Sequence, residues 1–197
     1  MTARLALLCA IILLCAGQAA AQSLAGFKIG DEAEKAKALG LPSDTGRFQE
    51  YSLTKWRLAN GNDLSMSIGA NGRIEYLETT WGATPAGAAA GMFGFTYGQT
   101  SRSQIRKKLG STGMTFRSRV PVMNTTEGLL MMNSYEVGSV IATFITLIAP
   151  QDLEKAKAGE LSDHARLVAV SLASADHAAQ NWGTATNDPA YKKLQAQ

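Results

Sequence analysis

Cysteine, histidine and proline are scarce in this sequence of 197 residues. It contains two cysteines, two histidines and five prolines. Both cysteines, Cys9 and Cys15, fall within the first 21 residues, so the rest of the chain has no thiol. This absence excludes disulfides, thiol catalysis and thiolate zinc sites beyond residue 21. We expect a fold stabilised by its apolar core alone, and a domain of this size buries about 70% of its unfolded surface.

Long membrane-spanning runs and biased tracts are also absent. Charged residues make up 18% of the chain and hydrophobic residues 46%, which excludes an integral membrane protein and a disordered chain. The apolar run 5–16 is shorter than the roughly 20 residues of a spanning helix. A basic start precedes this run and Ala19-x-Ala21 follows it, so we predict a signal peptide over 1–21 and a periplasmic or secreted protein. The alternatives are a buried N-terminal helix and a lipoprotein anchored at Cys15.

Two segments of the remaining chain resemble each other. Phe-Lys-Ile-Gly at 27–30 recurs as Phe-Thr-Tyr-Gly at 95–98, and each motif precedes a polar stretch that ends in Leu-Gly. Strand-like segments follow both stretches. An internal repeat of this kind indicates a repeated structural unit. We therefore predict an α+β fold of two tandem units, each a helix or helix pair followed by an antiparallel three-stranded meander.

The first predicted unit covers 22–82. Asp31 is expected to cap a helix that Gly40 ends. An extended segment over 47–58 follows, and Asn60-Gly61-Asn62 predicts a hairpin turn. Apolar residues then alternate with polar ones over 63–68, as in a half-buried strand, and a third strand is expected over 73–81.

The second predicted unit covers 93–175. Thr100 or Ser101 is expected to cap a helix with an apolar face. Residues 114–123 read as extended, with Pro121 at an edge or a bulge. The β-branched run 140–148 predicts a central strand, and 165–173 a last strand. A charged helix or loop is expected over 150–163.

Two further segments complete the predicted organisation. The small residues of 83–92 predict a linker between the units, with a short helix over 86–90 as the alternative. Residues 176–197 read as a polar C-terminal tail with a helix near Trp182.

The two units together resemble known repeat folds. A glycine before a helix, a Leu-Gly end and a meander that closes in Asn-Gly-Arg are similar to the β-lactamase-inhibitory protein and to the small lipoprotein of the outer-membrane β-barrel assembly machinery. The matching residues are Gly30, Leu39, Gly40, Leu41, Pro42, Asn71, Gly72, Arg73, Ile74, Gly98, Gln99, Thr100, Gln104, Ile105, Lys108, Leu109 and Gly110. The resemblance implies an inhibitor or an assembly factor, and it transfers no individual functional residue.

Catalytic motifs are missing from the sequence. There is no HExxH, P-loop or GxSxG pattern. His164 and His177 each follow an aspartate, and we interpret both as surface histidines, since neighbours on a strand or loop point apart. Glu75 and Glu78 are expected on opposite faces of a strand, a poor geometry for an acid/base pair. We predict neither a metal nor a cofactor, and no enzymatic activity.

One long interval lacks acidic residues. No Asp or Glu occurs between Glu78 and Glu127. Such an asymmetry can steer an anionic partner, with a solvated helix face as the alternative. Nucleic acid is a poor candidate, because only Phe116 interleaves with the cations. The basic residues of the interval are Arg102, Arg106, Lys107, Lys108, Arg117 and Arg119.

Aromatic residues of the first unit form a second candidate surface. Tyr51, Trp56, Tyr76 and Trp81 are expected either on a concave sheet face that binds a partner or buried against the helices. The hypothesis is an exported, non-catalytic binding module for an envelope or secreted protein with an acidic surface. One alternative is a carrier of an apolar or anionic molecule that uses Met131, Met132 and Phe144 with the basic helix. The other is a small hydrolase with His164 or His177 as base.

Overall fold

A computed structural model describes residues 22–82, 88–154, 156–157, 159–187 and 192–194. The predicted signal peptide, with Cys9 and Cys15, lies outside these residues. So do 83–87 of the predicted linker and 188–191 and 195–197 of the predicted tail.

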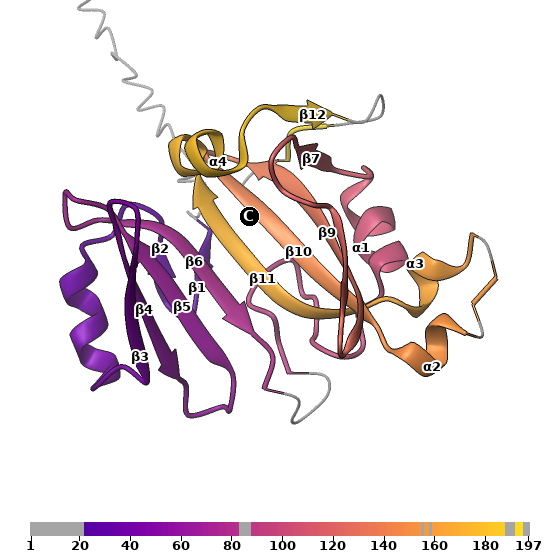
Figure 1. The fold of residues 1–197 in the computed structure, drawn as a ribbon, viewed down its shortest axis with the longest axis horizontal. Helices are drawn as coiled ribbons and strands as arrows, with labels where there is room; N and C mark the ends of the chain where they lie inside the picture. Colours follow the sequence, from indigo (N-terminus) through magenta and orange to yellow (C-terminus); the bar gives the residue numbers. More distant parts are fainter. Residues whose placement is uncertain (1–21, 83–87, 155, 158, 188–191, 195–197) are drawn as a thin grey trace, which may run out of the picture.

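One large antiparallel sheet of ten strands dominates the fold (Figure 1). Its order is β12-β7-β9-β10-β11-β6-β5-β4-β3, and β8 pairs with β9 beside this path. The strands are β3 (Asp44–Phe48), β4 (Tyr51–Arg57), β5 (Asp63–Ile68), β6 (Ile74–Thr80), β7 (Met114–Phe116), β8 (Val122–Thr125), β9 (Gly128–Val137), β10 (Val140–Ile148), β11 (Arg166–Ser174) and β12 (Ala185–Asn187). A separate two-stranded ribbon is made by β1 (Ser23–Leu24) and β2 (Phe27–Lys28).

The sheet crosses the boundary between the two predicted units. Strand β11 pairs with β6 from Ala169 opposite Thr80 to Ala173 opposite Tyr76. The predicted fold class of two tandem helix–meander units is therefore wrong. The repeated motif marks a repeated turn, because Gly30 and Gly98 both have positive φ, 85° and 70°. A turn of this kind needs glycine wherever it occurs and does not imply a repeated unit.

The helices are short. They are the 3-10 helix η1 (Ala33–Leu39) and the α-helices α1 (Arg102–Leu109), α2 (Pro150–Leu153), α3 (Leu161–His164) and α4 (Ala175–Trp182). Ser101 and Gln104 form a capping box at the start of α1, which confirms one of the two predicted caps. The predicted cap Asp31 is wrong: Glu32 precedes η1 without a side-chain cap bond, and Asp31 instead accepts from the Lys28 amide at 3.0 Å.

Several predicted strands are confirmed at the level of single elements. Strand β10 is central as expected, since it pairs with β9 on one side and β11 on the other. The alternating segment over 63–68 forms β5. The extended segment 47–58 is wrong in detail, because the chain reverses between Phe48 and Tyr51 to make the β3–β4 hairpin.

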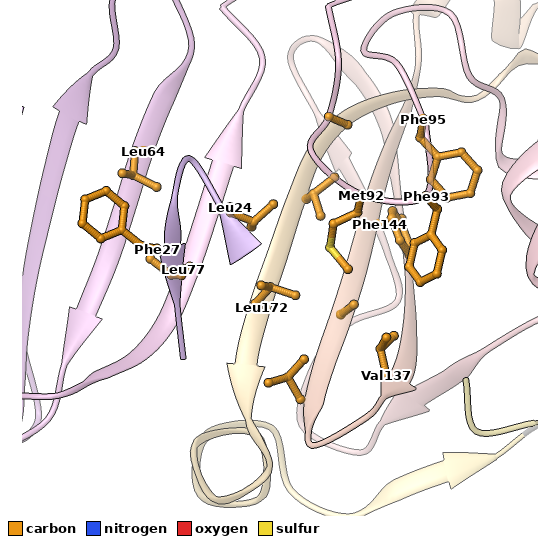
Figure 2. Packing of buried hydrophobic residues seen from close by; sticks show 14 of the residues in the cluster. Leu24, Phe27, Leu64, Leu77, Met92, Phe93, Phe95, Val137, Phe144 and Leu172 are labelled. Atoms are coloured by element: carbon orange, nitrogen blue, oxygen red, sulfur yellow. The ribbon is translucent and has the colours of Figure 1, made fainter. Parts of the chain in front are cut away.

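One face of the sheet carries the main apolar core. Phe144, Leu172 and Leu77 from three neighbouring strands lie in one cluster with Phe27 and Phe95 (Figure 2). The β1–β2 ribbon, η1, α1 and the segment around 92–95 supply the cover, through side chains in the same cluster. We call this the covered face. Within the described chain, no helix has the length and apolar character needed to cross a membrane.

Candidate functional site

The opposite face of the sheet is covered only in part. Met114 and Phe116 of β7 and Ala178 of α4 pack there on Ile141 and Ala173. The strand register shows which other side chains this face carries. Residues paired across neighbouring strands share a face, and alternate residues of each strand fall on it. One row across seven strands is polar or charged. This row runs through Ser134, Thr143, Ser171, Glu78, Ser65, Lys55 and Asp44. We call this side the uncovered face.

A hollow of about 550 Å³ opens on the uncovered face over β6, β9, β10 and β11. We call it the sheet hollow. Its volume lies within the roughly 300–1,000 Å³ of typical ligand pockets. The residues that line it are Glu78, Thr80, Trp81, Arg119, Glu127, Leu130, Met132, Ile145, Leu147, Val168 and Ala169.

The floor of the sheet hollow is apolar. Leu130 and Met132 come from β9, and Ile145 and Leu147 lie opposite them on β10. Ile145 also faces Ala169 of β11, just before the register shifts between Ile145 and Thr146. Successive side chains of a strand point to opposite faces of the sheet. A strand that is apolar at nearly every position therefore places apolar side chains on both faces. The apolar side chains on the covered face belong to the main core, and those on the uncovered face form the floor of the sheet hollow.

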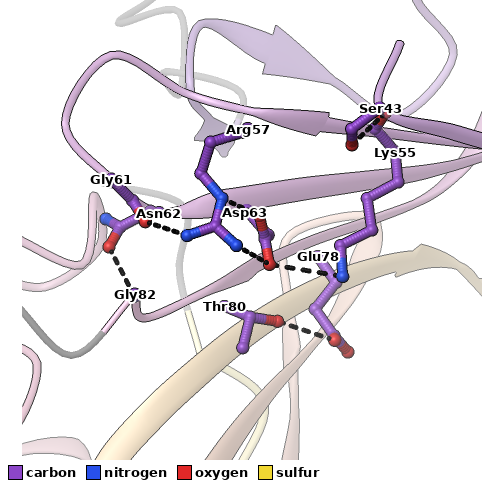
Figure 3. A network of polar contacts seen from close by, with 9 residues as sticks. All are labelled: Ser43, Lys55, Arg57, Gly61, Asn62, Asp63, Glu78, Thr80 and Gly82. Carbon is purple, nitrogen blue, oxygen red and sulfur yellow. Dashed lines mark hydrogen bonds and ion pairs between the residues drawn. The ribbon is translucent and has the colours of Figure 1, made fainter.

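Glu78 supplies the carboxylate at one side of the hollow. The Tyr76 hydroxyl donates a hydrogen bond to it, and the Thr80 hydroxyl donates another at 3.2 Å (Figure 3 shows the latter). Burial, with the neighbouring Glu78 charge, raises the pKa of Tyr76 well above its usual value. Tyr76 therefore stays protonated and remains a donor, which fixes the position of the Glu78 carboxylate.

Arg119 supplies a positive charge at the border of the sheet hollow. Its guanidinium lies over the Trp182 ring, 4.0 Å from the centroid, and donates to the Thr143 hydroxyl at 3.2 Å. The backbone before it is fixed by α4, because the Ser118 amide donates to the Trp182 carbonyl at 2.9 Å. Stacking on an aromatic ring suits the planar guanidinium and leaves donors for a partner.

Further charges continue along the uncovered face beyond Glu78. Asp63 of β5 forms ion pairs with Arg57 at 2.7 Å and with Lys55 at 3.2 Å (Figure 3). The cations of these pairs are largely exposed, so their contribution to stability is on the order of 0.2–1 kcal/mol. Next to them, Leu53 borders a second, shallower depression of about 320 Å³. The uncovered face thus combines an apolar hollow with a polar surround.

The structure separates the six predicted basic residues. Helix α1 packs on the covered face through Ile105 and Leu109. It carries Arg102 and Arg106, which are half-buried, and the exposed Lys107 and Lys108. Arg119 lines the sheet hollow on the uncovered face, and Arg117 is exposed near it in sequence. The six residues do not form one continuous patch.

The four predicted aromatic residues are also divided. Tyr51 and Tyr76 both contact His177, with ring centroids 4.8 Å and 5.5 Å from its ring. Trp56 is buried in the main core, and its indole donates to the Gly40 carbonyl at 3.3 Å. Trp81 borders the sheet hollow.

The remaining candidates for chemistry lie apart from one another. His164 ends α3 before the start of β11, whereas His177 lies in α4 after its end. Burial lowers the pKa of His177. Within the described ranges, no group of three or more His, Cys, Asp or Glu could hold a metal ion. Of the three apolar carrier residues, Met132 lines the hollow, while Phe144 and Met131 belong to buried clusters.

Sequence reasoning missed most of the sheet hollow. Among its lining residues, it had selected Trp81, Arg119 and Met132, and it had set Glu78 aside. The sequence does contain a signal for the apolar floor. Ile145 and Leu147 alternate with core residues such as Phe144, so the run 140–148 is apolar on both faces of its strand. Few segments of the chain read as helices able to cover both sides of so many strands.

Comparison with known proteins gives likeness at the level of structure. No protein-family profile and no curated protein sequence matches the chain. A cysteine-rich secretory protein from Staphylococcus aureus matches with a TM-score of 0.51 and 10% identity, over 88% of this chain and 53% of that one. The chain thus spans about half the length of that protein. At this identity the likeness shows the fold alone.

Two other solved structures give weaker matches. A DUF4309 family protein from Bacillus subtilis has a TM-score of 0.44 at 15% identity, covering 76% of this chain and 83% of that one. An extracellular protein containing an SCP domain from Bacillus anthracis has a TM-score of 0.48 at 10% identity, covering 78% and 46%.

These matches correct the resemblance inferred from the sequence. The fold is similar to that of a cysteine-rich secretory protein and its sheet joins the two predicted units, so the resemblance to the β-lactamase-inhibitory protein and to the barrel-assembly lipoprotein is wrong. The shared motifs are turn glycines and helix ends, which recur in unrelated folds. The repeat and the inhibitor role inferred from it are not supported.

Proposed function

We propose that this protein is an exported, non-catalytic binding module, and that the sheet hollow on the uncovered face is its binding site. Export rests on the basic and apolar pattern of residues 1–21 and on Ala19-x-Ala21. The secretory and extracellular descriptions of two similar structures agree with it.

The single observation that carries the proposal is the composition of the hollow. An apolar floor of about four large side chains is bordered by Glu78, Glu127 and Arg119. A desolvated apolar centre with a polar rim is the usual anatomy of a protein-binding hot spot. The apolar surface continues outward, because Met123 of β8 pairs with Leu130 and is 43% exposed.

The partner we propose is a protein outside the cytoplasm that inserts an apolar side chain into the sheet hollow. Arg119 and the exposed Arg117 would meet acidic groups of the partner, and Glu78 and Glu127 would meet basic ones. The absence of catalysis is part of the proposal. It is supported by the separation of His164 from His177 at opposite ends of β11.

A carrier of an apolar small molecule is the second candidate. The volume of about 550 Å³ favours it, since this space can hold a whole ligand rather than one side chain. Native mass spectrometry separates the two candidates. A co-purified small molecule that disappears in a hollow variant would support the carrier.

Substituting the floor of the hollow tests the proposal. Leu147→Gln places an amide on the half-buried floor, and Leu41→Gln makes the same change at a site that is 95% exposed. We expect Leu147→Gln to weaken capture of a stoichiometric partner from an extracytoplasmic fraction by at least about tenfold. The control should bind like the wild type. Equal binding by both variants, or turnover of hydrolase substrates, would overturn the proposal.

A further inference from the structure

A second pocket lies at the edge of the sheet, between α1 and the strands β7, β9 and β12. It has a volume of about 250 Å³, and both Arg102 and Arg106 line it. We call it the arginine pocket. No acidic residue lines it, and it shares only Met132 with the sheet hollow. A ligand of the arginine pocket would therefore bind separately from a partner in the sheet hollow.

Local sequence brings the two arginines together. The capping box at Ser101 starts α1, so Arg102 and Arg106 fall four residues apart on one side of the helix. Arg102 is held in place by Nε, which donates to the Asn133 side-chain oxygen, and by a second bond to Ser162 at 3.3 Å. Within the described residues, neither arginine forms an ion pair.

A turn on the other side of the pocket brings in a hydroxyl group. The Asn133 side-chain amide donates to the Thr112 carbonyl at 2.7 Å, and this bond connects the turn to β9. Gly113 makes the approach possible, because it has φ +84° and a Cβ there would lie 2.7 Å from the Ser134 carbonyl oxygen. Thr112 is thereby held at the wall of the pocket.

Two buried polar atoms at the pocket have no partner. Arg106 Nε and Thr112 Oγ1 are both buried and make no hydrogen bond within the described chain. A buried donor without an acceptor destabilises the folded state, and more so when it is charged. Two like charges four residues apart on a helix add a further unfavourable contribution.

We propose that the arginine pocket binds a small oxyanion, a carboxylate or a phosphate group, between Arg102, Arg106 and Thr112. Guanidinium groups present forked donors that match carboxylate and phosphate oxygens. Such an anion accepts from Arg106 Nε and from the Thr112 hydroxyl, and it offsets the repulsion between the arginines. Burial, with the charge of Arg106, lowers the pKa of Arg102 to about 10, so Arg102 stays charged at neutral pH.

Calorimetric titration with inorganic phosphate, and separately with acetate, tests this site at constant ionic strength. The wild-type protein should show saturable binding of at least one of the two at one site per chain. Acetate alone indicates a carboxylate ligand and phosphate alone a phosphate ligand. Arg106→Gln should weaken this binding at least about tenfold, because it removes charge-assisted hydrogen bonds. Lys107→Gln, an exposed change of the same charge on the same helix, should leave the affinity unchanged.

A second variant keeps the test decisive if Arg106→Gln does not fold. Thr112→Val preserves the shape of the side chain and removes only the unpartnered hydroxyl, so it should weaken binding of the same anion several-fold. The proposal is overturned if neither anion binds saturably, or if Arg106→Gln and Lys107→Gln bind alike. Loss of partner capture by Leu147→Gln has no bearing on this result, so the two proposals fail independently.

Discussion

Phe144 and Thr143 are neighbours on β10, yet they face opposite sides of the sheet. Phe144 points into the covered face, where its ring meets those of Phe95 and Tyr135 at centroid distances of 5.3 Å and 5.8 Å. Thr143 points to the uncovered face, where its hydroxyl lies 2.8 Å from that of Ser134 and accepts from Arg119. Both side chains are fully buried. At this point of the sheet, the covered face packs aromatic rings together, whereas the uncovered face holds polar groups in position.

The largest expected effect comes from the covered face. Phe144→Ala removes a ring at the centre of the main core, and we expect a loss of about 3–5 kcal/mol in the free energy of unfolding. Urea denaturation followed by tryptophan fluorescence measures it. A loss below about 1 kcal/mol would mean that the covered face does not stabilise the sheet as its packing indicates.

A smaller effect is expected one residue earlier in the chain. Thr143→Val keeps the side-chain shape and removes the hydroxyl that joins Ser134 to Arg119. We expect a loss of about 1–2 kcal/mol, because two buried or half-buried groups each lose a hydrogen-bond partner. The Arg119 side chain should also become more mobile, which NMR relaxation of its guanidinium would detect. An unchanged Arg119 would show that the Trp182 ring alone fixes it.

Features that depend on neighbouring residues could be predicted from the sequence, whereas features that join distant residues could not. The cap residue of α1, the alternation in β5 and the β-branched run of β10 are local patterns, and each predicted its element. The pairing of β11 with β6 joins residues such as Ala173 and Tyr76, which lie far apart in the sequence. No local pattern encodes that pairing, and the recurring Phe-x-x-Gly motif indicated a repeat instead.

The candidate sites show the same limit. The acid-free interval drew attention to Arg106 and Arg119, and these two residues line different pockets. Charge in the sequence does not specify which face of a sheet a residue reaches. The chain leaves the covered face after Leu109 of α1, and by Met114 it packs on Ile141 of the uncovered face, ahead of Arg119. Whether the surrounding cations steer an acidic partner stays a prediction.

The smallest expected effect concerns α4, which covers one end of the uncovered face. This effect is expected only as a change in the pH dependence of stability. His177 of α4 packs against Tyr51, Tyr76 and Trp182. Burial lowers the pKa of its imidazole below 6.5, partly opposed by the charge of Glu75. In the unfolded chain the imidazole regains its ordinary pKa of about 6.5.

These two pKa values set the sign of the effect. Between them the unfolded state binds more protons than the folded state, so the free energy of unfolding falls as the pH drops below 6.5 through the folded pKa. The contribution of His177 is complete above pH 6.5. His177→Gln cannot titrate, so its free energy of unfolding should decrease less than that of the wild type between pH 7.5 and pH 5. His164→Gln, at the opposite end of β11, is the matched control. A slope in His177→Gln equal to that of the wild type would mean that protonation of this imidazole does not strain the packing of α4 on the sheet.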